Sequence, residues 1–465
     1  MTTTPRTTDP LCTTSAPAGR RRRIAIIGGG ASGTLTALNL LRSGPETAEV
    51  TVFEPSGRLG RGVAYSTTDA RHLLNVRAHD MSALRDVPDD LLDWAAETGR
   101  PVAPSDFVPR RDYAVYLQDR VAAAGARHPG RLRVVASAVT DVEPVDGRFL
   151  VATAGGVEEE YDVVVLAYGN PAPRPLSVDG AELPEAPWHL ANPWDVARIA
   201  ALPDDATVVL VGTGLTAIDT AITLLGDAPG RRVVMVSRHG LLPEPHSDAP
   251  QPQLSLTIPE GPLTADGLAR FFEDEVADAR ARGIDWRAVV NALRAPTQSL
   301  WQRLPESERI AFLARYARHW EVRRHRMAPQ IAALIDGYRR EGRLAVCAGG
   351  LVSVDTDGAR PVVELADAKV AADAVVNCTG PLLDVTRTGN PLLRALRRRG
   401  IIAPDPLRLG VLSTPEGEVL DAAGRHVPGL FTVGPPRKGV LFETTAIPEI
   451  RVQAAEVAGR LVAAR

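Results

Sequence analysis

Two glycine-rich loops, each directly after a short apolar run, constrain this chain more than any other feature of its sequence. The first loop, Gly28-Gly-Gly-Ala-Ser-Gly33, follows the run 24–27, and the second, Gly212-Thr-Gly-Leu-Thr-Ala217, follows the run 207–211. Apolar residues at helical spacing come after each loop, and a further apolar run follows each predicted helix. A G-x-G-x-x-G/A motif in this order of strand, loop, helix and strand is typical of dinucleotide binding. The sequence therefore predicts an α/β protein with two Rossmann-type domains.

The first loop has the features of a site for a permanently bound FAD. Gly28 permits a tight turn, Gly30 lets the backbone approach a pyrophosphate, and Gly33 allows the helix to pack closely on the strand. The next predicted strand ends in Glu54, where a carboxylate can bond the hydroxyls of the adenosine ribose. We predict that these residues and Ser32 contact FAD.

The second loop differs at the position that recognises the ribose. The strand predicted over 232–236 leads into Arg238 and has no acid there. Because an arginine suits a 2′-phosphate, this site is predicted to take a dissociable NADPH, held by Gly212, Gly214, Thr216 and Arg238. The alternative is that Arg238 is an ordinary solvated charge.

The chain also repeats itself at long range. The segments 162–169 and 373–380 share the pattern Asp-x-Val-Val-x-x-x-Gly, and each ends a stretch of alternating residues punctuated by glycine. The alternation predicts an antiparallel β-meander in each half, followed by a closing strand. Two dinucleotide sites in one chain suggest electrons passing from a nicotinamide to a flavin. The predicted organisation is a disordered tail at 1–22, an FAD-binding domain at 23–203 and 340–465, and an NADPH-binding domain at 204–339 that carries a helical substrate cap.

Composition excludes several other classes of function. The 53 Lys and Arg residues against 56 Asp and Glu residues give a net charge of −3, so there is no cationic excess for nucleic acid. The three cysteines are widely spaced, which argues against a disulfide scaffold or a cysteine-rich zinc site. No apolar run approaches the roughly 20 residues of a membrane span. We expect a cytoplasmic protein with no bound metal and no nucleic-acid or membrane partner, and a homo-oligomer is possible.

Further segments, spread over nearly the whole chain, carry a more specific signature. They are Gly62–Thr67, His72–Val76, Met81-Ser82, Phe107–Arg110, Tyr113, Trp320–Pro329, Asn377–Pro381 and Glu443–Arg451. In these residues the sequence resembles the FAD/NAD(P)-binding oxidoreductase family related to flavin-dependent N-monooxygenases, and most of all the actinobacterial L-aspartate N-monooxygenases. The resemblance implies that an amino acid is N-oxygenated through a C4a-hydroperoxyflavin at the expense of NADPH and O2. The substrate it favours is L-aspartate, converted to nitrosuccinate in natural-product biosynthesis.

The same resemblance suggests which residues orient the flavin. Asn75 is expected to hydrogen-bond the ring and Met81 to pack on its face, although both could instead belong to the core. Gly169 and Gly434 are expected to offer backbone contacts. Two departures stand here: Tyr168 precedes Gly169 where such enzymes often have threonine, and a proline follows Gly434 where other flavoprotein reductases have aspartate.

A dicarboxylate substrate needs fixed cations, preferably arginines in bidentate geometry. The candidates are Arg437 and Lys438, beside the predicted flavin-facing helix, and Arg324 in the basic tract 323–326. The alternative is that this tract is a solvated charge run. Because the chemistry implied here is centred on the flavin, no catalytic side chain is predicted.

Two other functions remain open from the sequence alone. The chain could be an NADPH:acceptor flavin oxidoreductase or NADPH oxidase without oxygen insertion, since the fate of reduced flavin depends on the shape of the pocket. It could also be a non-catalytic, redox-sensing flavoprotein. The intact second loop argues against the sensor, because a scaffold has no need of a matched hydride donor.

Overall fold

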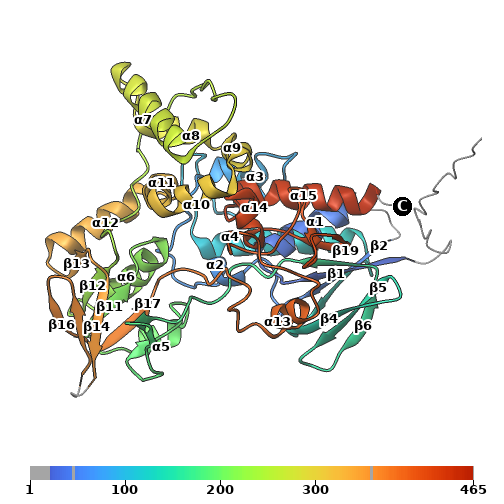
Figure 1. Ribbon diagram of the computed structural model, residues 1–465, viewed down its shortest axis with the longest axis horizontal. Helices are drawn as coiled ribbons and strands as arrows, with labels where there is room; N and C mark the ends of the chain where they lie inside the picture. The colour runs from blue at the N-terminus through green and yellow to red at the C-terminus, as the bar shows by residue number, and fades with distance from the viewer. Residues whose placement is uncertain (1–20, 44–47, 357–359, 464–465) are drawn as a thin grey trace, which may run out of the picture.

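Two mainly parallel sheets form the framework, and their central strands are the apolar runs that precede the glycine loops. The computed structural model describes residues 21–43, 48–356 and 360–463. Strand β1 (Arg22–Ile27) lies inside one sheet and β11 (Thr207–Val211) lies inside the other. Both are rich in buried Val and Ile, as expected for parallel strands covered on both faces. Figure 1 shows the two sheets towards opposite ends of the long axis.

The first sheet has six strands in the order β18-β19-β7-β1-β2-β3, of which only the β18–β19 pair is antiparallel. The strands besides β1 are β2 (Ala48–Phe53), β3 (Leu132–Val135), β7 (Val163–Leu166), β18 (Glu418–Leu420) and β19 (His426–Thr432). One face is covered by α1 (Ala31–Ser43), α4 (Arg110–Arg127) and α15 (Ile447–Ala463). The other face is covered by the meander β4 (Val139–Val145), β5 (Arg148–Thr153) and β6 (Glu158–Tyr161), and by α13 (Pro391–Arg398). This arrangement confirms the predicted first Rossmann-type half and its meander.

The second sheet is wholly parallel, with five strands in the order β10-β17-β11-β12-β13. The strands besides β11 are β10 (His189–Leu190), β12 (Arg232–Val236), β13 (Leu344–Cys347) and β17 (Ala374–Asn377). Helices α5 (Val196–Ala200), α6 (Leu215–Asp227) and α12 (Pro329–Arg340) cover one face. The meander β14 (Leu351–Asp355), β15 (Val362–Leu365) and β16 (Lys369–Ala371) covers the other. The short hairpin β8 (Ser177–Val178) and β9 (Ala181–Glu182) lies against β14.

Strand pairing corrects the predicted organisation of the chain in one respect. The closing strand β17 pairs with β11 in the second sheet, just as β7 pairs with β1 in the first. Strand β13 pairs with β12, and β10 also belongs to the second sheet. The chain therefore returns to the first half after residue 377, not at 340, because each half needs its own meander and closing strand to cover and complete its sheet. Most of the predicted tail at 1–22 lies outside the described residues.

A helical cap projects from the region between the two sheets (Figure 1). It consists of α7 (Ala265–Ala281), α8 (Trp286–Leu293), α9 (Thr297–Arg303), α10 (Glu306–Arg315) and α11 (Ala317–Arg324). Helices α10 and α11 meet at Tyr316, which is the C-cap of the first and the N-cap of the second. The remaining short elements, close to the sites below, are α2 (Gly62–Tyr65), η1 (Ala78–Asp80), α3 (Asp90–Glu97), η2 (Pro435–Arg437) and α14 (Lys438–Leu441). No helix in the described ranges is long and apolar enough to cross a membrane.

Candidate active site

The first glycine loop is packed so closely that three of its glycines, Gly28, Gly29 and Gly33, admit no side chain. Gly28 has a φ of +105°, and a Cβ there would lie 2.3 Å from the carbonyl oxygen of Ala167 at the end of β7. A Cβ on Gly33 would lie 1.9 Å from the carbonyl oxygen of Gly28. The carboxylate of Glu54 accepts a hydrogen bond of 3.0 Å from the Gly29 amide. The loop, the start of α1 and the acid therefore form one unit that fits a dinucleotide.

The second loop repeats this construction. Gly212 has a φ of +128°, and a Cβ there would lie 2.3 Å from the carbonyl oxygen of Cys378, which follows β17. Gly214 is the N-cap of α6, and a Cβ on it would point into open space. Thr216 lies in the first turn of the same helix. The open N-terminus of α6 is suited to a pyrophosphate, because its amides and its dipole both favour an anion.

A cavity of about 790 Å³, called here the dinucleotide cleft, joins the two halves. The predicted residues that line it are Asn75, Met81, Gly212, Gly214, Thr216, Arg238 and Lys438. Met81 is buried at the wall, and Asn75 is half-buried. The residues predicted to orient a flavin ring therefore face the same space as the second loop, as hydride transfer between two bound cofactors requires.

The C-terminal segment completes the first site. Gly434 has a φ of +85°, and a Cβ on it would lie 2.2 Å from Ser32 Oγ at the start of α1. Its amide donates to Gln453 Oε1 at 2.9 Å. Thr444, just before α15, is fully buried, and its Oγ1 has no partner among the described residues. A buried hydroxyl without a partner, beside the open cleft and the N-terminus of α15, fits a bound flavin.

Contacts between the halves concentrate on α6. Arg110, at the start of α4, forms a largely buried ion pair of 3.3 Å with Asp219. His72 Nε2 is 2.9 Å from the Asp219 carbonyl oxygen, and Arg71 forms an ion pair of 2.7 Å with Asp227. These contacts were not predicted, although His72 and Arg110 lie in the signature segments, since only the fold brings the residues opposite α6. Gly169, with a φ of +70°, lies just after β7, beside the wall of the cleft.

Arg238 is exposed at the rim of the dinucleotide cleft. A second cation, Arg318 of α11, lines the same cleft and donates to Thr213 Oγ1 at 2.9 Å. Burial, with a smaller contribution from the charge of Arg238, lowers the pKa of Arg318. Arg318 was not predicted, because it lies far along the chain from the second loop and only the fold brings it to the cleft. Together, Arg238 just after β12 and Arg318 of α11 are suited to a phosphate monoester on the ribose.

Replacing Arg238 with alanine is expected to raise the KM for NADPH roughly 10- to 100-fold, as loss of one charge-assisted contact implies. The KM for NADH should change little, because NADH lacks the 2′-phosphate. Steady-state oxidation of both nucleotides measures this, with Arg339→Ala, at an exposed position of α12, as the control. Equal effects on the two nucleotides would remove Arg238 from 2′-phosphate recognition.

A second cavity, of about 930 Å³, adjoins the cleft at Asn75 and Val76, which line both. Six arginines line it, and it is called here the arginine-lined cavity: Arg77, Arg287, Arg294, Arg324, Arg326 and Arg437. Three of the six are paired with carboxylates. Arg287 pairs with Asp285 at 3.0 Å, and Arg294 and Arg324 pair with Glu449 at 2.7 and 3.2 Å.

The other three arginines have no ion-pair partner in the described part of the chain. Arg77 donates to the carbonyl oxygens of Ser105 and Ser247, Arg326 donates to Asn291 Oδ1, and Arg437 donates to Gln453 Oε1. Arg326 is 5% exposed and Arg437 is 1% exposed. Burial, aided at Arg326 by neighbouring arginines, lowers the pKa of each to about 10. Since uncompensated buried charge is costly, this cavity is suited to an anion.

The predicted substrate residues divide between the two cavities. Arg324 and Arg437 line the arginine-lined cavity, whereas Lys438 faces the dinucleotide cleft, with Nζ 3.6 Å from Glu321 Oε1. Within the basic tract, Arg324 and Arg326 are buried rather than solvated, whereas Arg323 lines a different pocket, described below. The sequence missed Arg77, Arg287 and Arg294, since isolated arginines on separate elements leave no local pattern.

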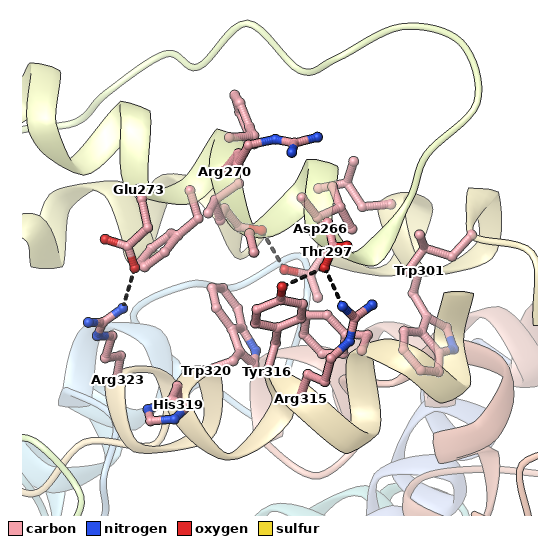
Figure 2. A pocket seen from close by; sticks show the side chains of 18 of the residues that line it. Asp266, Arg270, Glu273, Thr297, Trp301, Arg315, Tyr316, His319, Trp320 and Arg323 are labelled. Atoms are coloured by element: carbon pink, nitrogen blue, oxygen red, sulfur yellow. Dashed lines mark hydrogen bonds and ion pairs between the residues drawn. The ribbon is translucent and has the colours of Figure 1, made fainter. Parts of the chain in front are cut away.

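Arg323 belongs to a third, apolar pocket of about 690 Å³ inside the cap (Figure 2). It forms an ion pair of 3.0 Å with Glu273 across the pocket, and Tyr316 donates to Asp266 at 2.5 Å. Trp320 Nε1 donates to Glu443 Oε1 at 3.2 Å. The cap is thereby tied to the segment that leads into α15.

Comparison with known proteins agrees with this architecture. Residues 25–171 match a family model described as FAD-NAD(P)-binding, so the first half of the chain contains an FAD/NAD(P)-binding domain. No curated protein matches the chain. Three similar solved structures are L-lysine 6-monooxygenase from Pseudomonas syringae (19% identity, 96% of this chain and 100% of that chain, TM-score 0.62), ornithine N-hydroxylase from Kutzneria (14%, 95% and 99%, 0.60), and the FAD-bound cadaverine monooxygenase of Erwinia amylovora (14%, 96% and 95%, 0.65).

The fold is that of the flavin-dependent N-hydroxylating monooxygenases. The similarity extends over both sheets and the cap, since it covers almost the whole chain. It confirms the predicted fold class of two Rossmann-type halves. At sequence identities of 14–19% the comparison establishes the fold alone. The substrate has to be inferred from the residues of the site.

Proposed function

We propose that this protein is a flavin-dependent N-monooxygenase that uses FAD, NADPH and O2 to oxygenate the amino group of a dicarboxylic amino acid. L-aspartate, converted to nitrosuccinate, is the best candidate. The observation that carries the proposal is the arginine-lined cavity, which meets the dinucleotide cleft at Asn75 and Val76. An anionic substrate held there would present its amino group towards the dinucleotide cleft, which is lined by the second glycine loop and by the predicted flavin-orienting residues Asn75 and Met81.

The charge of the cavity favours a dicarboxylate over a diamine. Arg77, Arg326 and Arg437 are free of carboxylate partners among the described residues, and a second ammonium group beside them would be repelled. The names of the similar structures mention lysine, ornithine and cadaverine, each of which carries two amino groups. The fold supports the reaction class, and the arginines support a different substrate within it.

The chain's own residues would bind and orient the reactants. When bound, FAD would supply the oxygen derived from O2 after reduction by NADPH. The two loops would hold the cofactor phosphates, and the arginines would fix both carboxylates of the substrate. The amine would thereby be oriented when the substrate binds, so that the entropy of orientation is not lost in the chemical step. The cap above the cavities would limit access of water to the reacting groups.

The purified flavoprotein tests this proposal directly. NADPH oxidation is followed with L-aspartate, L-asparagine or L-ornithine, while hydrogen peroxide and nitrogen-oxygenated products are measured together. L-aspartate should stimulate turnover and yield a hydroxylamino or nitro product at the expense of peroxide. NADPH consumed to peroxide alone with every amine would instead identify an NADPH oxidase or flavin reductase.

A further inference from the structure

One histidine lies beside the carboxylate-free arginines of the arginine-lined cavity. An isolated bridge joins Pro245 to Met327, and the His246 amide donates to the Met327 carbonyl oxygen at 2.8 Å. This pairing places His246 next to Arg326, the residue before Met327. The imidazole packs against Phe107, with 5.0 Å between the ring centroids, and lines the cavity.

Hydrogen bonding fixes the state of this imidazole. His246 Nε2 is 3.0 Å from the carbonyl oxygen of Asn75. Because a carbonyl oxygen only accepts, Nε2 carries the proton in this contact. Nδ1 has no partner in the described ranges, so its lone pair is available. The residue that orients the ring, Asn75, also lines the dinucleotide cleft.

The charges around the ring keep it neutral. Burial, together with the charges of Arg326, Arg77 and Arg287, lowers the pKa of His246 to about 3. Acidic side chains also line the cavity: Asp80, Asp248, Glu449 and Glu456. Asp80 and Glu449 are engaged with Arg294. The free protein therefore holds a neutral base beside an anion site.

We propose that His246 accepts a proton from the ammonium group of the bound substrate. The proposal rests on the N-oxygenation proposed above, which needs an amine with a free lone pair. An α-ammonium group is mostly protonated at pH 7. In the step, one N–H bond of the ammonium breaks, its electron pair stays on nitrogen, and the proton forms an N–H bond at Nδ1. The imidazolium returns the proton to solvent after the product leaves.

Substrate carboxylates would switch this base on. Bound beside Arg326 and Arg77, they offset the positive charges that disfavour imidazolium, so the basicity of His246 rises when substrate is present. The acceptor is thus weak in the empty cavity and stronger when an ammonium group is there to be deprotonated. General bases of this kind contribute about 100-fold or more to rate.

Nuclear magnetic resonance of 15N-histidine-labelled protein tests the switch without turnover. Succinate, a dicarboxylate without an amine, is the probe, and His246→Gln identifies the resonance. In the free protein, His246 should show the Nε2–H tautomer and no titration between pH 5 and 8. Succinate should raise its pKa into or towards that range. A pKa unchanged by saturating succinate would overturn the proposal.

Kinetics of His246→Gln test the proton transfer itself. Glutamine can still donate to the Asn75 carbonyl oxygen, but it has no basic nitrogen. The kcat for L-aspartate at pH 7 should fall about 100-fold and recover as pH rises, while KM stays within about threefold. A wild-type pH profile in the variant would overturn the role of His246. If the wild-type protein oxygenates no amino acid, the proposed function is overturned instead. The succinate titration needs no turnover, so its result is independent of that outcome.

Discussion

Replacing Arg326 with glutamine should raise the KM for L-aspartate roughly 30- to 5,000-fold, because removing one partner of a buried charge pair costs about 2–5 kcal/mol. Arg326 is 5% exposed, has no carboxylate partner in the described part of the chain, and lines the arginine-lined cavity. Flavin reduction by NADPH in the absence of amino acid should be unchanged. Stopped-flow reduction and steady-state oxygenation separate the two effects.

The basic tract itself supplies a matched control for this experiment. Arg323→Gln removes the same charge three residues away, but Arg323 pairs with Glu273 in the apolar pocket of the cap. Its effect on KM should stay within about twofold, as for an exposed ion pair. Arg326→Lys should fall between the two, since lysine keeps the charge and loses the planar fork. If Arg323→Gln and Arg326→Gln weakened binding equally, general charge rather than the cavity would be responsible.

Alanine at the two glycine loops should separate the two cofactors. Gly33→Ala should yield protein without bound flavin, because its Cβ would lie 1.9 Å from the Gly28 carbonyl oxygen and α1 could not stay in place. Gly212→Ala should retain flavin but lose reduction by NADPH at least about 100-fold, since a φ of +128° strains any side chain. Flavin content by absorbance and reduction by NADPH against dithionite measure these outcomes.

Gly337→Ala on α12 is the control for both, since a Cβ there meets nothing within 4 Å. It should leave flavin content and reduction unchanged. Loss of flavin in Gly212→Ala with normal flavin in Gly33→Ala would reverse the assignment of the two sites.

The sequence predicted what depends on neighbouring residues. Strand, loop and helix follow one another within 22–43 in the first half and 207–227 in the second, and in each half a meander comes later in the chain, before the closing strand. The sequence could not predict which cavity a given side chain faces. Arg437 and Lys438 are adjacent, yet the turn from η2 into α14 directs them into different cavities. The domain boundary at 340 was wrong for a similar reason, because only strand pairing shows which sheet receives β13 and β17.

Side-chain contacts with α6 set the separation of the two dinucleotide sites. Arg71, His72 and Arg110 bind one helix of the second half, and Asn75, which faces the cleft, follows three residues after His72. The distance between the two proposed cofactor sites therefore depends on a few side-chain contacts close to the cleft.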